Sequence, residues 1–237
     1  MALQEEPSLG VHHLTHDITP YNTFEASYRL FQTVEYWPEG TTFVSVVDPG
    51  VGSSRKSVVA LTKTGQYIVT PDNGTLSYIK KVVGIEAVRE ISEVENRRSN
   101  TELSYTFHGR DVYAYTGAKL ASGHISFEEV GPELPVDKIL ELPVVETIIE
   151  DNLVRGAIDI LDVRFGSLWT SITRDDFYAL EPNFGDRFEV TIFNNDMLVY
   201  QNQVTYGKSF ADVRIGQPII YINSLYRVCL LYTSDAA

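Results

Sequence analysis

Aromatic positions at helical spacing mark the first clear element of the chain. Three aromatic side chains recur every three or four residues between positions 23 and 34, so they would share one face of a helix. They are Phe24, Tyr28 and Phe31. Asn22 and Glu25 stand where a helix N-terminus favours a capping pair. The pattern predicts an amphipathic helix over 23–34.

Short apolar runs predict strands, and each is followed by a turn sequence. Residues 42–47 are nearly all apolar or β-branched, which predicts a strand buried on both faces. Residues 66–70 predict a second strand, followed by PDNG at 71–74 and a helix that Gly84 can end. Another helix is expected after FHGRD at 107–111. Strands that alternate with helices are typical of an α/β domain.

The pattern changes after residue 131. Three prolines and few periodic positions between 131 and 143 indicate a linker. Beyond it, alternating runs on either side of the turn at 194–196 predict a β-hairpin, and 154–161 and 218–222 predict further strands. We therefore predict an α/β N-terminal domain with a central mixed sheet flanked by helices, a linker, and a small all-β, barrel-like C-terminal domain. Their expected bounds are 1–135, 136–150 and 151–237.

Composition narrows the class of protein. The 237 residues carry a net charge of −13, and this acid excess argues against nucleic-acid binding, which needs a basic face. No apolar run reaches the roughly 18 residues that span a bilayer, and the first residues lack a signal-peptide core. The single cysteine, Cys229, excludes an internal disulfide and a multi-thiolate metal site. We expect a cytoplasmic protein without membrane or nucleic-acid partners.

The densest candidate for chemistry is VDPGVGSSR at 47–55, directly after the first predicted strand. Open α/β sheets bind ligands at the carboxyl ends of their strands, which favours a role for Asp48. An ordinary Asp-Pro-Gly turn explains the same residues without any function. PDNG at 71–74 would share this edge of the sheet if the strands are parallel, although Asp-Asn-Gly is itself a strong turn signal.

A second candidate is His108 in FHGRD, at a predicted helix start. A helix N-terminus disfavours the imidazolium ion, so His108 is expected to be neutral and able to accept a proton. The alternative is a histidine satisfied by local hydrogen bonds beside an ordinary capping carboxylate, Asp111.

Three histidines and an aspartate in HHLTHD at 12–17 suggest a metal site at first sight. Side chains four residues apart align on a helix, but the residues around this segment, 11–20, favour a strand. In a strand His12 and His16 share one face and the other two side chains take the opposite face. No face then collects a full ligand set, so we expect no metal.

Taken together and in this order, VDPGVGSSR, PDNGTLSYI and TFHGRD resemble the S-adenosylmethionine hydroxide adenosyltransferase superfamily, which also includes fluorinases and chlorinases. WPEGT at 37–41 is similar to the family's FPEGT element, and 162–172 is similar to its DxFGNxxTNI element. The resemblance extends from about residue 2 to residue 227. It implies an α/β domain followed by a small β-barrel. It also implies a homotrimer that binds S-adenosylmethionine between the N-terminal domain of one subunit and the C-terminal domain of the next.

The resemblance also implies a reaction. Hydrolytic members carry an Asp–Arg–His set that halide-using members lack, and this set corresponds to Asp48, Arg55 and His108. The implied activity is S-adenosyl-L-methionine hydrolysis to adenosine and L-methionine by attack of an activated water on the ribose C5′. His108 would accept the proton directly or through a relay, Asp48 would orient the water or the imidazole, and Arg55 would hold Asp48. A neutral thioether leaves, so no metal or redox cofactor is expected.

Eight further residues are expected to bind the substrate: Tyr21, Asp72, Asn73, Phe107, Asp162, Ser167, Asn223 and Ser224. Asp162 matches a family position that binds the amino group of the methionine moiety, and Asn223 and Ser224 match an element near the adenine. Tyr21 and Phe107 have an alternative interpretation as core aromatics.

The sequence also departs from the family pattern. Ser167 and Ser171 stand where the family has asparagines. The chain starts after the family's opening strand with its ribose-binding aspartate, and residues 229–237 resemble translated adapter read-through, with a genuine edge strand as the alternative. Two other functions therefore stay open: a protein that binds S-adenosylmethionine or adenosine without turnover, and a halide-using enzyme, against which the full Asp–Arg–His set argues.

Overall fold

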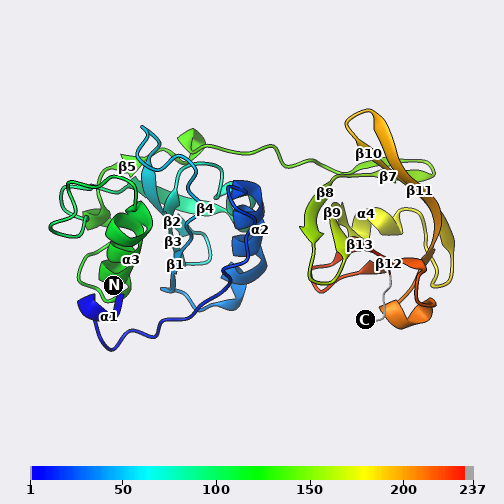
Figure 1. Ribbon diagram of the computed structural model, residues 1–237, viewed down its shortest axis with the longest axis horizontal. Coiled ribbons are helices and arrows are strands. Elements are labelled where there is room, and N and C mark those ends of the chain that lie inside the picture. The colour runs from blue at the N-terminus through cyan, green and yellow to red at the C-terminus, as the bar shows by residue number, and fades with distance from the viewer. Residues whose placement is uncertain (1, 233–237) are drawn as a thin grey trace. The chain divides into compact units, whose positions relative to one another are not determined.

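The computed structural model describes residues 2–232 of the chain, so residue 1 and residues 233–237 lie outside the described part. The chain folds into two compact units, with the boundary between Val144 and Val145 (Figure 1). Residues 139–142 lie within the expected linker but contact the first unit, because the backbone N–H of Leu140 donates to Asp72 and that of Leu142 donates to Ser77.

A five-stranded mixed sheet forms the centre of the first unit, in the order β1-β3-β2-β4-β5. β1 runs parallel to β3, and all other neighbours are antiparallel. The strands are β1 (Thr42–Val44), β2 (Ser57–Thr62), β3 (Tyr67–Pro71), β4 (Ile85–Glu90) and β5 (Glu133–Leu134). The parallel pair fixes which loops meet, because both of its strands end at the same edge of the sheet.

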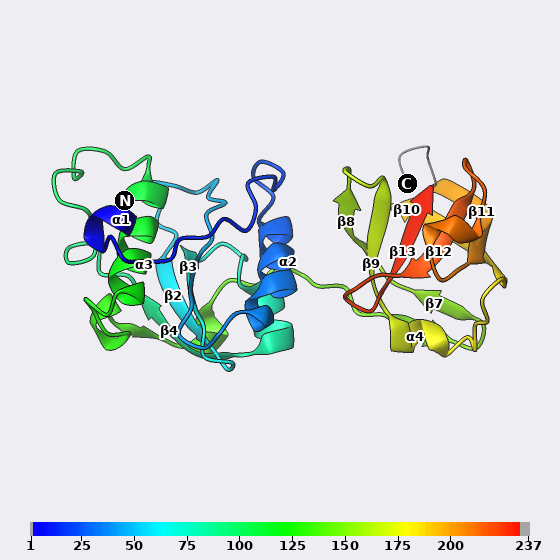
Figure 2. The same ribbon diagram turned by 90° about the horizontal axis from the view of Figure 1, so that it is seen from below.

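Helices cover both faces of this sheet, with α2 on one side and α3 on the other in both views (Figures 1 and 2). The α-helices of the unit are α1 (Ala2–Glu5), α2 (Thr23–Thr33) and α3 (Ala114–Ala121). Two π-helical turns, η2 (Ile79–Val83) and η3 (Gly109–Tyr113), precede β4 and α3. Short 3₁₀ turns complete the unit at η1 (Val34–Tyr36), η4 (Glu128–Val130) and η5 (Val136–Lys138).

Alternation along the strands explains why two helical layers are needed. Successive strand residues point to opposite faces, so a strand that is apolar throughout must be covered on both sides. Val58 packs in one core cluster with Leu30 of α2, while its neighbour Val59 packs in the other with Leu120 of α3. The sheet is therefore buried between two separate cores.

Local hydrogen bonds set the start of α2. The side chain of Asn22 accepts from the backbone N–H of Glu25 at 2.9 Å, which confirms the expected cap. The Glu25 carboxylate accepts from the backbone N–H of Thr19 instead of closing the pair on Asn22. In the helix interior, Ser27 accepts from the backbone N–H of Tyr78, which ties α2 to the turn before η2.

The second unit is a curled six-stranded sheet with a separate two-stranded hairpin. Its order is β10-β11-β12-β13-β9-β8. The strands are β8 (Ile158–Asp162), β9 (Ser167–Thr173), β10 (Arg187–Asn194), β11 (Met197–Tyr206), β12 (Pro218–Ile222) and β13 (Arg227–Tyr232). The hairpin is β6 (Ile148–Glu150) with β7 (Leu153–Arg155), and the helical turns are α4 (Arg174–Tyr178) and η6 (Phe210–Asp212). Phe177 of α4 packs into the core of the curled sheet, among Val204 and Tyr206 of β11.

The predicted fold class is confirmed in both units, including the hairpin and the strand at 218–222. Three local predictions are wrong. The strand at 42–47 is only three residues long and leaves Val44 exposed. The run 154–161 is two strands that are separated at Gly156, where the backbone lies so close to β9 that a Cβ atom would stand 2.7 Å from the Ser171 hydroxyl. Residues 11–20 form no strand.

The segment expected to depart from the family pattern is partly a central strand. β13 pairs with β12 on one side and with β9 on the other, so it is not an edge strand. Cys229, in its middle, is fully buried. The last five residues of that segment, 233–237, lie outside the described residues.

Ile68→Ala tests the core between the sheet and α2. Ile68 is fully buried, so we expect the free energy of unfolding of the first unit to fall by about 2–5 kcal/mol. Trp37 packs on the same cluster, and its fluorescence in a Trp169→Phe background reports this unit alone during denaturant unfolding. Val94→Ala, at a 97% exposed position, is the control and should change stability by less than about 0.5 kcal/mol. Equal effects of the two substitutions would contradict this description of the core.

Candidate active site

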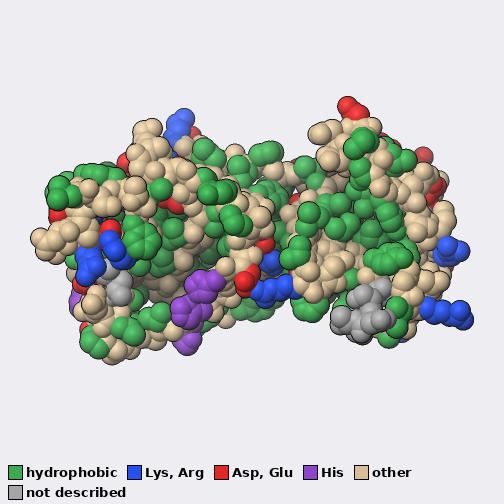
Figure 3. Space-filling model, viewed as in Figure 1, with side chains coloured by type: hydrophobic (Ala, Val, Ile, Leu, Met, Phe, Trp, Pro, Cys, Tyr) green, Lys and Arg blue, Asp and Glu red, His purple; other side chains and the backbone are tan. Residues whose placement is uncertain are grey.

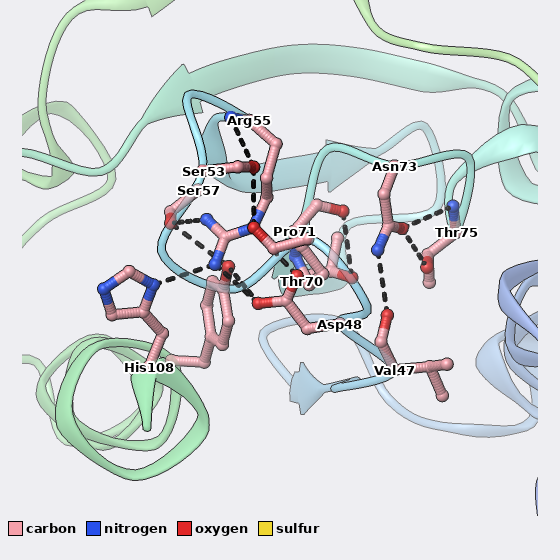
Figure 4. Close-up of polar contacts among 12 residues, drawn as sticks. Val47, Asp48, Ser53, Arg55, Ser57, Thr70, Pro71, Asn73, Thr75 and His108 are labelled. Carbon is pink, nitrogen blue, oxygen red and sulfur yellow. Dashed lines mark hydrogen bonds and ion pairs between the residues drawn. The ribbon is translucent and has the colours of Figure 1, made fainter. Parts of the chain in front are cut away.

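The candidate site lies at the edge of the sheet where β1 and β3 both end. Asp48 follows β1, and the backbone carbonyl of the residue before it, Val47, accepts a hydrogen bond from the Asn73 side chain at 2.8 Å. Asn73 itself follows β3. The parallel pairing of β1 with β3 therefore brings PDNG to the same edge as VDPGVGSSR, as predicted (Figure 4).

A tight turn returns the chain from Asp48 to Arg55, so the turn interpretation of this motif is also correct. Backbone N–H groups of Val51 and Ser53 donate to the carbonyls of Asp48 and Gly50. Gly52 has a φ of +79°, and a Cβ atom there would stand 3.1 Å from the backbone oxygen of Tyr105. Both features favour glycine and let the 100–107 loop approach the turn.

Arg55 joins the two other predicted catalytic residues. Its Nε donates to Asp48 Oδ1 at 2.9 Å, and its Nη2 donates to Asp48 Oδ2 at 2.5 Å. The same Nη2 lies 2.8 Å from His108 Nδ1. Figure 4 shows the guanidinium between the carboxylate and the imidazole. The structure thus brings together three residues that are up to 60 positions apart in the sequence.

This contact fixes the proton on His108. A guanidinium has only donors and stays protonated, so His108 Nδ1 must be the acceptor. A neutral His108 therefore carries its hydrogen on Nε2. That nitrogen is buried and has no hydrogen-bond partner among the described residues, so the alternative of a histidine satisfied by local hydrogen bonds is wrong.

Burial sets the protonation state of the site. Desolvation of the buried His108 lowers its pKa below the ordinary 6.5, and the guanidinium groups of Arg55 and Arg97 lower it further. The negative charges of Glu93 and Asp48 act in the opposite direction without reversing the shift. His108 is therefore neutral at pH 7, and the causes are burial and the two guanidinium groups rather than the helix start on which the sequence-based prediction relied.

The hydroxyl groups of Ser57 and Tyr113 form hydrogen bonds with Arg55 and Asp48. Ser57 accepts from Arg55 Nη1 at 2.9 Å and lies 3.1 Å from the Tyr113 hydroxyl. Tyr113 in turn donates to Asp48 Oδ2 at 3.5 Å, and burial raises its pKa above the ordinary value. Since Tyr113 stays protonated, it acts as a donor to the carboxylate. Sequence reasoning missed both residues, although Tyr113 lies one turn beyond His108.

Other residues of PDNG (71–74) and FHGRD (107–111) make contacts that stabilise the local structure. The Asn73 side-chain amide donates to the Val47 carbonyl and accepts from the Thr75 hydroxyl. The Asp72 carboxylate accepts from the backbone N–H of Leu140, and burial raises the pKa of Asp72. Asp111 is no capping residue: it is fully buried and forms a bidentate pair with Arg110, which lowers the pKa of the carboxyl. These contacts give the residues a structural explanation.

The two predicted aromatic contacts are on the surface. Tyr21 is 79% exposed and Phe107 is 53% exposed, so the alternative that they are core aromatics is wrong. The Arg110 guanidinium lies 4.7 Å from the centre of the Phe107 ring. Tyr21 has a φ of +68°, which is uncommon for a residue with a bulky side chain.

The second unit holds a pocket of about 860 Å³ that gathers the other predicted substrate residues. Those lining it are Asp162, Ser167, Asn223 and Ser224. Asp162 is almost fully buried, and its carboxylate accepts from the backbone N–H of Arg164. Ser167 accepts from the Trp169 indole, and Asn223 accepts from two backbone N–H groups of its own turn.

Sequence reasoning missed the aromatic walls of this pocket. They are Phe165, Trp169, Phe210, Tyr221 and Tyr232, and Lys208 also lines the pocket. Burial raises the pKa of Tyr221 to about 12 and that of Cys229 behind it to about 12, so both stay protonated. A buried carboxylate beside aromatic faces suits a ligand that has both a cationic group and a flat ring.

The histidine segment before α2 lies on the surface, where Figure 3 shows histidine side chains gathered on one face of the first unit. His13 Nδ1 and His16 Nε2 are 2.9 Å apart, and His12 contacts the Trp37 ring. Within residues 2–232, no three His, Cys, Asp or Glu side chains are arranged to hold a metal ion. In the same range, no helix combines the length and apolarity that crossing a bilayer requires.

Comparison with known proteins identifies relatives over nearly the whole chain. The chain is 31% identical to an (R)-S-adenosyl-L-methionine hydrolase of Thermus thermophilus, over 93% of this chain and 79% of that protein. A hydrolase of the same name from Methanocaldococcus jannaschii is 36% identical over 69% of this chain, and the match spans only 54% of that relative's length. A fluorinase of Actinopolyspora mzabensis is 26% identical over 88% of this chain and 76% of its own length.

Solved structures and family models agree with these relatives. An uncharacterized conserved protein from Thermotoga maritima matches with a TM-score of 0.87 at 32% identity, over 99% of this chain and 86% of that one. Residues 1–131 match the model of the SAM hydroxide adenosyltransferase N-terminal domain, and residues 156–237 match that of its C-terminal domain. The chain belongs to the SAM hydroxide adenosyltransferase family.

Proposed function

We propose that this chain hydrolyses S-adenosyl-L-methionine to adenosine and L-methionine. The observation that carries the proposal is the contact of Arg55 with both Asp48 and a neutral His108, because it places a carboxylate, a cation and a proton acceptor in one cluster. Relatives at 31–36% identity that bear the name of this hydrolase support it.

The proposed reaction is a displacement at the ribose C5′. The water oxygen forms a bond to C5′, and the C5′–S bond breaks with its electron pair passing to sulfur. Methionine leaves as a neutral thioether, so the leaving group needs no proton and the reaction calls for no metal or redox cofactor. The one proton released comes from the attacking water, and a base has to accept it.

Asp48 is suited to orient that water. Its Oδ1 accepts one hydrogen bond, from Arg55 Nε, and a carboxylate oxygen has a second lone pair for an O–H donor. Arg55 holds the carboxylate in a fixed plane through two parallel bonds, which gives the water one defined position. The guanidinium also stabilises negative charge that develops on the attacking oxygen.

His108 is the proton acceptor, directly or through a second water. The lone pair on His108 Nδ1 points at Arg55. Nδ1 can accept a proton from water when the hydrogen bond from Arg55 is replaced by one from the water. Arg55 meanwhile keeps both bonds to Asp48. A low pKa keeps this lone pair available at neutral pH.

The pocket of the second unit is proposed to hold the rest of the substrate. Asp162 would bind the amino group of the methionine moiety, and Asn223 and Ser224 would lie near the adenine. We further propose a homotrimer in which the Asp48 cluster of one subunit meets the pocket of the next. A cytoplasmic location is proposed because the only cysteine of the sequence, Cys229, is buried and unpaired.

Mass spectrometry in ¹⁸O-labelled water tests the reaction. We expect equal amounts of methionine and of adenosine with one ¹⁸O in its 5′ hydroxyl, because water attacks C5′. Since the relatives are named for the R form of the substrate, each sulfonium epimer is assayed separately. Saturable binding with intact substrate recovered would instead indicate a binding protein. A 5′-halogenated adenosine that forms only with added halide would indicate the halide-using alternative.

The pH profile tests the role of His108. Because its pKa lies below 6.5 and the neutral form accepts the proton, kcat/KM should be constant at neutral pH and fall only below that lowered pKa. An imidazole titration by NMR should give the same pKa. The free energy of unfolding should change in the same direction as the activity. Between pH 6.5 and the lowered pKa, the unfolded chain binds a proton at His108 that the folded chain does not bind. The folded protein therefore loses stability as the pH falls through this range. A kinetic limb unrelated to the NMR titration contradicts the proposed role.

Subunit mixing tests the shared site. Asp48→Asn and Asp162→Ala should each reduce activity by about 100-fold or more, because one removes the carboxylate at the water and the other removes the partner of the amino group. If the two halves of a site come from different subunits, an equimolar mixture that has exchanged subunits regains about a quarter of the wild-type activity by random pairing. Asp137→Asn, at an exposed position, is the control. No recovery after proven exchange contradicts a site between subunits.

A further inference from the structure

A second carboxylate lies behind His108, on the side away from Arg55. Glu93 Oε2 is 3.8 Å from His108 Nε2, while Arg55 contacts the other ring nitrogen, Nδ1. Glu93 belongs to the segment that follows β4, separate from the three motifs that carry the family resemblance. The imidazole therefore lies between two pairs of opposite charge, Asp48 with Arg55 and Glu93 with Arg97.

The ring nitrogen that faces Glu93 needs an acceptor. Because Nδ1 accepts from Arg55, the hydrogen of neutral His108 is on Nε2, which is buried without a hydrogen-bond partner in the described chain. A buried N–H group without an acceptor is costly, and the carboxylate oxygen at 3.8 Å is less than 1 Å beyond the usual hydrogen-bond distance. Glu93 therefore supplies a nearby acceptor for this hydrogen, at a distance slightly longer than a hydrogen bond.

Arg97 holds Glu93 in this place. Its Nη1 donates to Glu93 Oε2 at 2.6 Å, and its Nη2 donates to the backbone oxygen of Ser104 at 2.7 Å. The guanidinium also lies over the Tyr105 ring, 4.7 Å from its centre, and this ring is nearly perpendicular to the His108 ring at 6.3 Å between centres. Arg97 thus links Glu93 to the 100–107 loop that precedes His108.

We propose that Glu93, held by Arg97, is the positioning partner of His108: it accepts the hydrogen that Arg55 leaves on Nε2 and stabilises the imidazolium that forms when Nδ1 accepts the proton of the attacking water. The proposal rests on the hydrolase function proposed above. It follows the general arrangement in which a third group orients a catalytic base and balances the charge it gains.

The charges that face His108 show why such a partner is needed. Once Nδ1 is protonated, it points toward Arg55, which is itself a cation and a donor, so protonation is opposed on that side. Arg97 opposes it as well, and Tyr113 stays neutral. Glu93 is the largest favourable charge, ahead of Asp48, which is already paired with Arg55. Without Glu93, His108 is a weaker base.

Glu93 also gives the accepted proton a route to water. Its side chain is 34% exposed, whereas that of His108 is 5% exposed. The Nε2 hydrogen of the imidazolium can pass to the carboxylate and then to solvent, which leaves a neutral His108 with its hydrogen on Nδ1. Return to the Nε2–H tautomer, which the Arg55 contact favours, then needs one further proton exchange with water at each ring nitrogen.

Glu93→Gln isolates the charge, because glutamine keeps the size and the acceptor oxygen. NMR of ¹⁵N-histidine-labelled protein should show His108 as the Nε2–H tautomer in wild type and in this variant, with its pKa lowered by about half a unit to one unit in the variant. Glu93→Ala removes the acceptor too, so the Nε2–H resonance should move upfield, while the Arg55 contact keeps the tautomer unchanged. Glu95→Gln, at an exposed position of the same segment, should match wild type in each measurement.

Kinetics then separate positioning from a merely structural role. At pH 7 we expect kcat of Glu93→Gln to fall about 5- to 20-fold with KM within about 2-fold, and the acidic limb of the profile to shift with the NMR pKa. The NMR measurement needs no turnover, so an inactive wild-type chain would contradict the hydrolase function while the Nε2–H resonance and the pKa still decide the role of Glu93. Glu93 variants that match Glu95→Gln in Nε2–H resonance, pKa and kcat would overturn the proposal.

Discussion

The shared hydrogen bonding of Arg55 is the contact on which the candidate site depends. One guanidinium nitrogen donates to Asp48 at 2.5 Å and to His108 at 2.8 Å, so a single side chain fixes the carboxylate plane and the histidine tautomer together. Lysine could not replace it, because an ammonium lacks the planar fork that makes two parallel bonds to a carboxylate. The orientation of a water on Asp48 and the side on which His108 is basic are therefore set by the same group.

The sheet supplies the frame that makes this contact possible. β1 and β3 are parallel, and the Asn73 amide ties the loop after β3 to the backbone just before Asp48. Gly52 lets the next turn pass close to the 100–107 loop, from which His108 follows. Burial of the strands between two helical layers holds this edge rigid, whereas the residues that would contact substrate, such as Phe107, lie exposed beside it.

Sequence patterns predicted those parts of the fold in which local chemistry decides the outcome. The cap at Asn22 and the hairpin around 194–196 follow from side chains close in sequence, and both are confirmed. The family resemblance named Asp48, Arg55 and His108 as one set, and the fold shows that the three side chains meet. Glu93 was not predicted, because a glutamate followed four residues later by an arginine is typical of an ordinary surface pair. The split between β7 and β8 falls at Gly156, whose close approach to β9 no local pattern indicates.

The pairing of Asp48 with Arg55 also bears on how a cationic substrate would react. A bare carboxylate near a sulfonium would stabilise the substrate, whose positive charge is lost as the C5′–S bond breaks, and so would raise the barrier. With Arg55 bound to it in a bidentate pair and His108 neutral, the cluster has no net charge and gives the ground state no such advantage. The cluster instead acts through the direction of its groups. Asp48 offers a lone pair that orients the water, and the positive charge of Arg55 stabilises the attacking oxygen as it gains electron density. Glu93 adds its negative charge behind the imidazole, where it favours the proton that His108 receives.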